Sequence, residues 1–261
     1  MIKLIATDVD GTLVPEGTAD INTEIFEVIA RLHEKGIQIA VSSGRHWSSV
    51  EWLFRPVASK LFYVTDNGAY VGIRGRTLFV NNTRRAYTDE LIRLVRGDEE
   101  LAIVASDENG YAIEKKDETL ISLLTEGYHT KCRVVDDLTK QNDFMKTSVY
   151  CPTESSWKRA EKIRTAMQGK LKIERSGEKW LDTNAFGMNK GVGIRLLQNS
   201  LSIRPEETMV FGDQGNDIEM LRSAWYSFAV KNAVPRAKEA ARFEADEVSR
   251  NGVLKILKML V

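Results

Sequence analysis

The first 80 residues alternate short strand-like runs with a helical segment, and this order constrains the fold more than any other feature. The runs 3–7, 37–41 and 61–65 are apolar and rich in β-branched or aromatic residues, as buried strands are. The segment 22–35 repeats its apolar residues at helical spacing, and Gly36 suits the end of a helix. Strands separated by helices of this length predict βαβ units and a parallel sheet covered on both faces.

The pattern changes after Gly68. Two short runs, 70–73 and 77–80, flank a glycine-containing turn and predict a β-hairpin. From about residue 84 to 186, strands and helices follow one another in an α+β order. Regular alternation resumes at about residue 189, so the middle of the chain is interpreted as an insertion into an α/β domain.

We therefore expect an α/β fold: a Rossmann-like parallel-sheet core of residues 1–82 and 187–261, with an inserted α+β domain of residues 83–186. Helices of the insert are expected near 88–96, 117–126 and 156–168. In the C-terminal part of the core, helices are expected at 189–199, 215–222, 235–242 and 253–260, and strands at 208–211 and 226–230.

Composition excludes some classes of function. Hydrophobic residues make up 43% of the 261 positions and charged residues 28%, which is ordinary for a folded globular protein. Lys+Arg and Asp+Glu both number 37, so the net charge gives no reason to expect nucleic acid or an anionic membrane as a partner. The chain starts without the apolar core of a signal peptide, and no stretch is long enough to span a bilayer, so we expect a cytoplasmic location.

The densest group of chemically active residues follows the first expected strand, in the sequence DVDGT. Asp8 and Asp10 are two residues apart, so on a strand both carboxylates would point to the same side. In open parallel sheets, ligands bind at the carboxyl ends of the strands. Gly11 permits a sharp turn out of the strand. An ordinary acidic turn is the alternative interpretation of the motif taken alone.

Two further positions could contribute to a binding site together with this motif. Ser43-Gly44-Arg45 follows the second strand, where we expect a helix to begin, and backbone N–H groups there can bind phosphate together with the Ser43 hydroxyl. The alternative is an ordinary serine N-cap. Lys190 lies at another expected helix start, where a cation is unfavourable and an anionic group nearby would compensate. A solvated lysine is the alternative.

A fourth motif, FGDQGND, again follows a strand and contains Asp213 and Asp217. With Asp8 and Asp10, it would bring four carboxylates to neighbouring strand ends, where like charges repel unless a cation neutralises them. Mg²⁺ accepts such an all-oxygen site, because it keeps several waters and is bound by few protein ligands together with substrate phosphate. The sequence therefore predicts a Mg²⁺ site.

These four motifs, in this order, resemble those of the haloacid dehalogenase superfamily. The serine-glycine-arginine sequence, the large insert and the sequence NDIEML after Asn216 resemble its Cof-like subgroup with a type IIB cap. Asn232-Ala233 and Asn251-Gly252-Val253 are similar to the closing signature of that subgroup. The resemblance implies a magnesium-dependent phosphatase whose insert is a cap domain.

The resemblance also implies roles for individual residues. Asp8 would attack phosphorus and become an aspartyl phosphate. Asp10 would protonate the leaving alcohol and then deprotonate the attacking water, and Lys190 would hold phosphoryl oxygens. The metal ligands would be Asp8, the backbone carbonyl of Asp10, and Asp213, with Asp217 in support. The positions implied to bind phosphate or substrate are Ser43, Gly44, Arg45, Asn67, Gly68 and Asn216.

The leading functional hypothesis is a phosphomonoester hydrolase that acts on small phosphorylated metabolites, with sugar phosphates as the favoured class. A phosphosugar mutase shares these motifs, including Asp10, and stays an alternative. A sensor that binds a phosphorylated ligand without catalysis predicts damage to a catalytic position, and none is visible at Asp8, Asp10, Lys190 or Asp213. The nearby residues His46 and Trp180 could line the pocket, although packing is the commoner role of both types.

Overall fold

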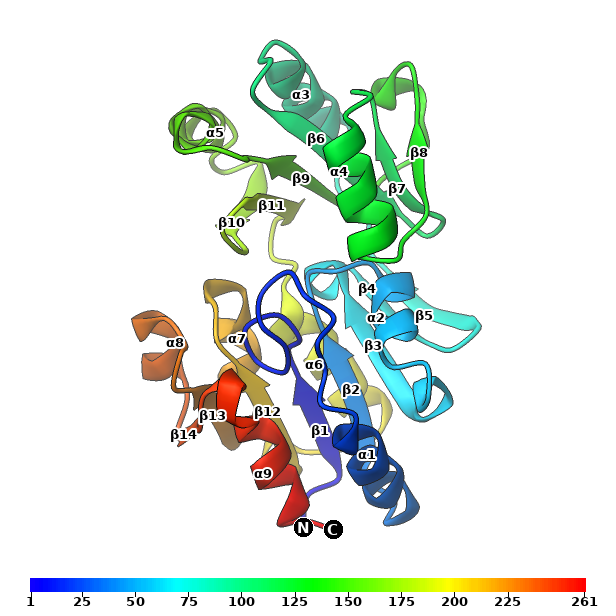
Figure 1. Cartoon of the computed structure of the whole chain (residues 1–261), viewed down its shortest axis with the longest axis vertical. Coiled ribbons are helices and arrows are strands. Elements are labelled where there is room, and N and C mark those ends of the chain that lie inside the picture. The colour runs from blue at the N-terminus through cyan, green and yellow to red at the C-terminus, as the bar shows by residue number, and fades with distance from the viewer. The chain divides into compact units, whose positions relative to one another are not determined.

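The chain folds around two β-sheets, each with its own set of helices (Figure 1). The computed structural model describes residues 1–261. Met1–Phe79 and Asn189–Val261 pack together as one unit, called the core unit below. Val80–Met188 form the second, called the insert unit. The α/β fold class predicted from the sequence is confirmed by the parallel sheet of the core unit.

The core unit contains an eight-stranded sheet in the order β14-β13-β12-β1-β2-β3-β4-β5. The strands from β14 to β3 are parallel, and β4 runs antiparallel to β3. Their bounds are β1 Leu4–Thr7, β2 Gln38–Ser42, β3 Leu61–Thr65, β4 Tyr70–Ile73, β5 Arg76–Val80, β12 Thr208–Gly212, β13 Tyr226–Val230 and β14 Phe243–Ala245.

The order of the strands locates the place where a ligand can bind. From β1 the chain builds outward through β2 and β3, then returns after the insert unit to β12, on the other side of β1. The direction of winding therefore changes between β1 and β12, which pair side by side near the centre of the eight-stranded sheet (Figure 1). In open α/β sheets, such a change leaves a crevice at the carboxyl ends of the two strands.

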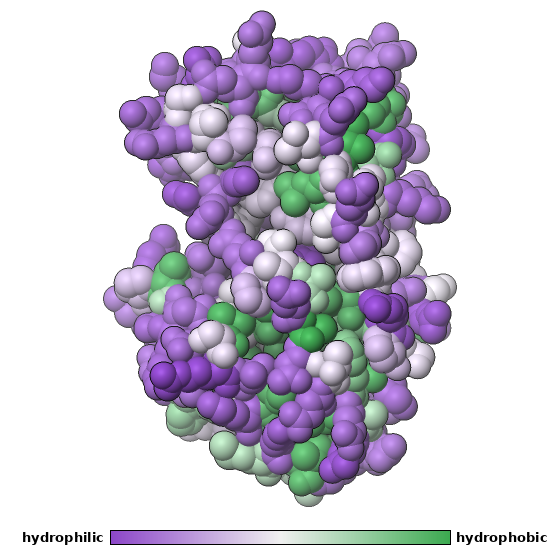
Figure 2. All heavy atoms as spheres, in the orientation of Figure 1, coloured by the Kyte–Doolittle hydropathy of each residue, from purple (hydrophilic) through white to green (hydrophobic).

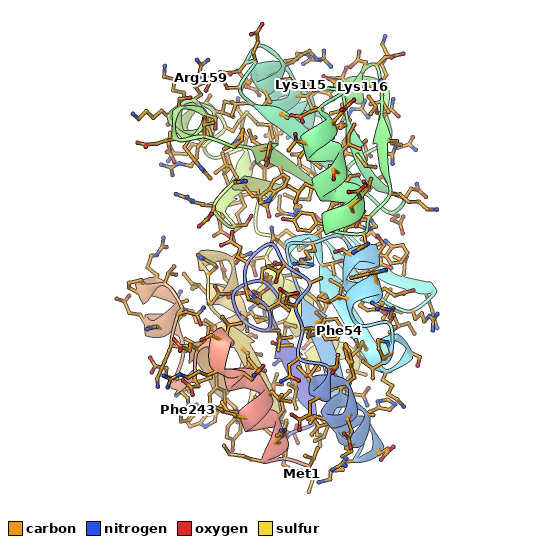
Figure 3. All side chains as sticks on the ribbon, in the orientation of Figure 1. Met1, Phe54, Lys115, Lys116, Arg159 and Phe243 are labelled. Carbon is orange, nitrogen blue, oxygen red and sulfur yellow. The ribbon has the colours of Figure 1, made fainter.

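Helices cover both faces of this sheet because each presents one apolar side. In Figure 1, α1 and α9 lie in front of the strands and α6 behind them. The buried side of α1 carries Ile25, Val28, Ile29 and Leu32. Phe54, labelled in Figure 3, is fully buried at the end of α2 and meets the ring of Phe26 edge-on. The helix bounds are α1 Glu24–Glu34, α2 Trp47–Leu53, α6 Lys190–Ser200, α7 Ile218–Leu221, α8 Pro235–Ala240 and α9 Gly252–Lys258.

The insert unit is built on a six-stranded sheet in the order β10-β11-β9-β6-β7-β8. All neighbouring strands are antiparallel except β7 and β8. The strand bounds are β6 Ala102–Asp107, β7 Gly110–Ile113, β8 Cys132–Val134, β9 Lys146–Tyr150, β10 Leu171–Arg175 and β11 Trp180–Ala185. Its helices are α3 Arg85–Arg96, α4 Glu118–Ser122 and α5 Glu154–Ala166.

Alternating side chains give the insert sheet two apolar faces. One face, with Ile103 and Val149, packs against α3 and α5. The other, with Val104 and Tyr150, packs against α4 and the π-helical turn Leu123–Gly127 that continues it. This alternation is the period of two that an antiparallel strand buried on both sides requires.

Two details differ from the sequence-based expectation. The helix expected directly after the second strand starts later, at Trp47, with His46 as its N-cap. Two contacts of Ser43 hold the preceding segment in a non-helical conformation: its side-chain hydroxyl accepts from the Arg45 N–H, and its carbonyl accepts from the Asn67 N–H. The helix expected at 215–222 is a 3₁₀ turn followed by the short helix α7.

The face of the molecule drawn in Figure 2 is mostly hydrophilic, with apolar residues lying between hydrophilic ones. No helix combines the length and the apolar character needed to cross a bilayer.

Candidate active site

Three carboxylates meet at the carboxyl ends of β1 and β12. Asp8 directly follows β1 and Asp213 directly follows β12, so the pairing of these two strands brings the side chains together. Oxygens of Asp8, Asp213 and Asp217 all lie within 4.8 Å of one another, and all three residues are buried. Parallel strands thus concentrate negative charge at the point where the winding of the sheet reverses.

Lys190 is the cation of this cluster. It is the first residue of α6, and its Nζ donates to Asp8 Oδ1 and to Asp217 Oδ1, at 2.6 Å each. Its side chain is 1% exposed. Burial acts to lower the pKa of Lys190, but the nearby charges of Asp217 and Asp8 outweigh it and raise the pKa. These carboxylates also supply the negative charge that a lysine at a helix N-terminus requires.

One lysine does not neutralise three carboxylates. Burial, followed by repulsion from Asp217, raises the pKa of Asp8 to about 7 against the lowering effect of Lys190. Burial, followed by the charges of Asp8 and Asp217, raises the pKa of Asp213 to about 9. With one lysine among three buried carboxylates, the ionised cluster carries net negative charge, so its oxygen donors fit a divalent cation.

Asp217 uses both carboxylate oxygens within the protein. Oδ1 accepts from Lys190, and Oδ2 accepts from the backbone N–H groups of Asp213 and Gln214, at 2.9 Å each. It therefore holds Lys190 and fixes the loop after β12. This arrangement suits the supporting role that the sequence analysis expected for Asp217 better than direct metal ligation.

Residues of the turn after β1 also contact the carboxylate cluster, mainly at Asp213. Thr12 Oγ1 donates to Asp213 Oδ1 at 2.8 Å, and it lies 3.4 Å from Asp8 Oδ2. Gly11 has a φ of +78°, and a Cβ there would lie 2.3 Å from Asp213 Oδ2, so a side chain at this position would displace Asp213. The Asn232 amide donates to the Gly11 carbonyl at 2.7 Å. Neither Thr12 nor Asn232 was predicted as a site residue, although Thr12 belongs to the DVDGT motif and Asn232 to the closing signature.

Asp10 does not join the carboxylate cluster. Its Oδ2 accepts from Arg45 Nε at 2.8 Å, and its Oδ1 accepts from Arg45 Nη2 at 2.6 Å. Arg45 was expected to bind phosphate, and its pair with Asp10 was not predicted. The two carboxylates of the DVDGT motif therefore have different surroundings: Asp8 faces Lys190, whereas Asp10 faces Arg45.

The expected phosphate-binding positions come from three loops. Asn67 N–H donates to the Ser43 carbonyl at 3.2 Å, which joins the loops after β3 and β2. Asn216 Nδ2 donates to Asn67 Oδ1 at 3.1 Å, which joins the loop after β12 to both. Gly68 has a φ of +92°, and a Cβ there would lie 2.3 Å from the Asn189 carbonyl. Gly44 lies next to Ser43 in the loop after β2.

Two residues that could line the pocket, His46 and Trp180, make contacts within their own units. His46 is buried and caps α2, where its Nδ1 accepts from the Ser48 N–H. Trp180 lies in the insert unit, donates to the Tyr128 hydroxyl at 3.2 Å and packs against Tyr150.

Comparison with known proteins identifies the family of the chain. The chain matches the haloacid dehalogenase-like hydrolase family over residues 5–257. A 5-amino-6-(5-phospho-D-ribitylamino)uracil phosphatase of Escherichia coli (strain K12) is 28% identical, covering 98% of this chain and 95% of its own. A solved structure from Eubacterium rectale is 35% identical, with a TM-score of 0.87 and coverage of 100% of this chain and 99% of its own. A Cof-like hydrolase from Plasmodium vivax shares the fold, with a TM-score of 0.88, 24% identity, and coverage of 99% and 95%.

The chain therefore belongs to the haloacid dehalogenase superfamily of hydrolases. Within that class it is a phosphatase of the Cof-like subgroup, as the order of its motifs predicted.

Proposed function

We propose that this protein hydrolyses the phosphate monoesters of small metabolites in a Mg²⁺-dependent reaction that passes through a phosphorylated Asp8. The observation that carries the proposal is the buried contact of 2.6 Å between Lys190 Nζ and Asp8 Oδ1, within the cluster of three carboxylates. A carboxylate held in one orientation by a buried cation, beside loops that present backbone N–H groups, suits attack on phosphorus.

The first chemical step forms a bond between an Asp8 oxygen and phosphorus while the bond from phosphorus to the leaving oxygen breaks. Asp10 gives a proton to that oxygen, and an alcohol leaves. In the second step, Asp10 takes a proton from water, whose oxygen attacks phosphorus and releases inorganic phosphate and the Asp8 carboxylate. Ser43, Lys190 and Asn216 hold phosphoryl oxygens through both steps.

The donor set of the site supports Mg²⁺ as the cation. Its ligands would be the carboxylates of Asp8 and Asp213 and the backbone carbonyl of Asp10, and it would offset the charge of the phosphoryl group. Thr12 and Asp217 keep these groups in place, since Thr12 donates to Asp213 and Asp217 anchors the backbone of the same loop. Lys190 carries the remaining positive charge.

The substrate class that we propose is a phosphorylated polyhydroxy compound, with sugar phosphates first. The relative from Escherichia coli is named for a substrate whose phosphate is carried by a ribityl chain, and the chain is similar to that relative over nearly its whole length. Such a leaving group is an alkoxide, which needs a proton from a general acid such as Asp10.

We further propose that residues 83–186, which form most of the insert unit, act as a mobile cap. The chemistry places two opposing demands on water, since bulk water weakens the electrostatic interactions of the first step and one water is a reactant in the second. A domain that closes over the substrate and reopens for the product meets both demands.

The proposal is tested by measuring phosphate release from a panel of sugar, polyol and aryl phosphates, with Mg²⁺ and with a chelator. Acid quenching during turnover, followed by reduction with borohydride, should convert phosphorylated Asp8 to homoserine, which mass spectrometry detects. Phosphate release in the chelator, or labelling at a residue other than Asp8, would contradict the mechanism. Isomerised sugar phosphate without net phosphate release would instead identify a mutase.

A further inference from the structure

The ion pair formed by Arg45 and Asp10 lies in the core unit, and the proposed chemistry leaves it without a role. Arg45 donates to both carboxylate oxygens, through Nε at 2.8 Å and Nη2 at 2.6 Å. The Arg45 side chain is 5% exposed and that of Asp10 is 25% exposed. The parallel arrangement of two N–H donors on two oxygens fixes the plane of the carboxylate as well as its position.

Arg45 is itself held rigidly. Its backbone N–H donates to the Ser43 hydroxyl at 3.1 Å, and its carbonyl accepts from the Asp66 N–H at 3.1 Å. Arg45 thus links the loops after β2 and β3, and both its backbone N–H and its backbone carbonyl are hydrogen-bonded. The guanidinium is planar, so two hydrogen bonds to one carboxylate cost less side-chain freedom per bond than two separate donors would.

Arg45 also binds the segment that follows Asp10. Nη2 donates to the Thr18 carbonyl at 2.7 Å, in addition to Asp10 Oδ1. The Gly17 N–H donates to the same Asp10 oxygen at 3.1 Å. One guanidinium therefore joins the carboxylate of Asp10 to the loop that returns over it, and the loop contributes an N–H group to the same carboxylate.

We propose that Arg45 is the positioning residue of Asp10: it holds the carboxylate and the loop at Gly17 and Thr18 in the orientation from which Asp10 serves the leaving oxygen. This inference rests on the acid–base role proposed for Asp10. Arg45 then has a function other than phosphate binding, because Nε and Nη2 of its planar guanidinium already donate to the two oxygens of the Asp10 carboxylate.

The test compares two substrates in the phosphorylation step. In single-turnover experiments on Arg45→Gln, phosphorylation of Asp8 by the best alkyl phosphate of the panel should slow by roughly ten- to a hundredfold, a part of the 10²–10⁴-fold that a general acid supplies. Phosphorylation by 4-nitrophenyl phosphate should change by less than about threefold, because its leaving group needs little protonation. Arg45→Lys, which keeps the charge but not the fork, should fall between Arg45→Gln and the wild type.

A double-mutant cycle with Asp10→Asn isolates the coupling between the two residues. Once Asp10 is replaced, the further change Arg45→Gln should have almost no effect on the alkyl phosphate. Inhibition by inorganic phosphate should be nearly unchanged in Arg45→Gln, whereas loss of a direct charged phosphate contact would weaken it by about tenfold or more. Arg31→Gln, which removes an exposed pair with Glu27 on α1, is the matched control and should leave both substrates unaffected.

The outcomes separate the two claims. If Asp10→Asn distinguishes the substrates but Arg45→Gln slows both equally and weakens phosphate inhibition, Arg45 is a phosphate ligand and the inference is overturned, while the proposed function stands. If Asp10→Asn slows both substrates equally, the acid role of Asp10 fails and the inference on Arg45 fails with it. Should Arg45→Gln not fold, Arg45→Lys gives the same comparison.

Discussion

Lys190 Nζ donates to Asp8 Oδ1 at 2.6 Å although the two residues are 182 positions apart in the chain. The contact joins the first strand of the core unit to the first helix after the insert unit, so the candidate site is complete only when both segments of the core unit have folded together. Because Lys190 also contacts Asp217, loss of any one of the three charges changes the balance for the other two.

Replacement of Asp8 by asparagine should separate catalysis from stability. Asp8→Asn removes the nucleophile, so turnover should fall by several orders of magnitude. The metal-free protein should be at least as stable as the wild type at pH 8, because burial and Asp217 raise the pKa of Asp8 to about 7 and the ionised form is therefore disfavoured. Phosphate release and thermal unfolding in a chelator measure the two effects. Substantial turnover by this variant would rule out Asp8 as the nucleophile.

Replacement of Lys190 should have the opposite effect on stability. Lys190→Met leaves Asp8 and Asp217 buried without their cation, which should destabilise the metal-free protein by roughly 3–5 kcal/mol and abolish turnover. Adding Asp217→Asn should restore part of the stability and none of the activity. Urea unfolding of the single and double variants measures the difference. Equal stability of Lys190→Met and the wild type would show that the carboxylates are not ionised together.

The order of elements in the core was predictable from local patterns. Short apolar runs and helical spacing identified β1, α1, β2 and β3, and the strand-end positions of the motifs placed Asp8 beside Asp213. This succeeded because parallel strands align their carboxyl ends, so a motif that follows a strand has a known location before any side chain is placed.

The contacts of Asp10 and Thr12 were not predictable in the same way. Whether Arg45 turns toward a phosphate or toward Asp10 depends on the irregular backbone after β2, where the helix starts only at Trp47. The sequence signals an N-cap by a serine, threonine or aspartate, and here His46 caps instead. Side-chain direction in a loop follows from contacts between distant segments, which periodicity does not describe.

The apparent affinity for Mg²⁺ should rise with pH. The pKa of Asp8 is raised to about 7 and that of Asp213 to about 9, so below these values the metal must displace protons from its own ligands. Between about pH 6 and pH 9, the dissociation constant should fall by up to about tenfold per pH unit for each proton released. Calorimetry in buffers of different ionisation enthalpy counts these protons. An affinity that is independent of pH would show that both carboxylates are ionised before the metal binds.

The stability of the metal-free protein should fall as the pH rises, because of the same pKa shifts. The folded protein holds the protons of Asp8 and Asp213 more tightly than the unfolded chain, whose aspartates have a pKa of 3.8. Their stabilising effect is therefore fully present below about pH 4 and is lost as the pH rises through about 7 and 9. The melting temperature in a chelator should fall between about pH 5 and pH 9.

Asp213→Asn provides the control for this pH dependence, because it removes the group with the most raised pKa and should flatten the fall. Carboxylates whose pKa is lowered to about 2, such as Asp137 and Asp246, change charge below this window and leave it undisturbed. A melting temperature that rises with pH in the wild type would contradict the predicted sign.

The last prediction concerns the two connections between the units. On the first, Thr83 is anchored within the insert unit, where its N–H donates to the Phe144 carbonyl at 2.8 Å, so bending is expected before it, at 80–82. On the second, Phe186 is 74% exposed and Gly187 has a φ of +87° with no atom near its missing Cβ. If residues 83–186 close over substrate, vanadate together with Mg²⁺ should slow limited proteolysis at both connections, whereas either reagent alone should not.

Gly187→Ala meets no clash but strains the backbone by about 1 kcal/mol or more, so it should alter turnover of a large sugar phosphate more than that of 4-nitrophenyl phosphate. Cleavage that is indifferent to the ligands, combined with equal effects of Gly187→Ala on both substrates, would mean that the insert unit is not a mobile cap.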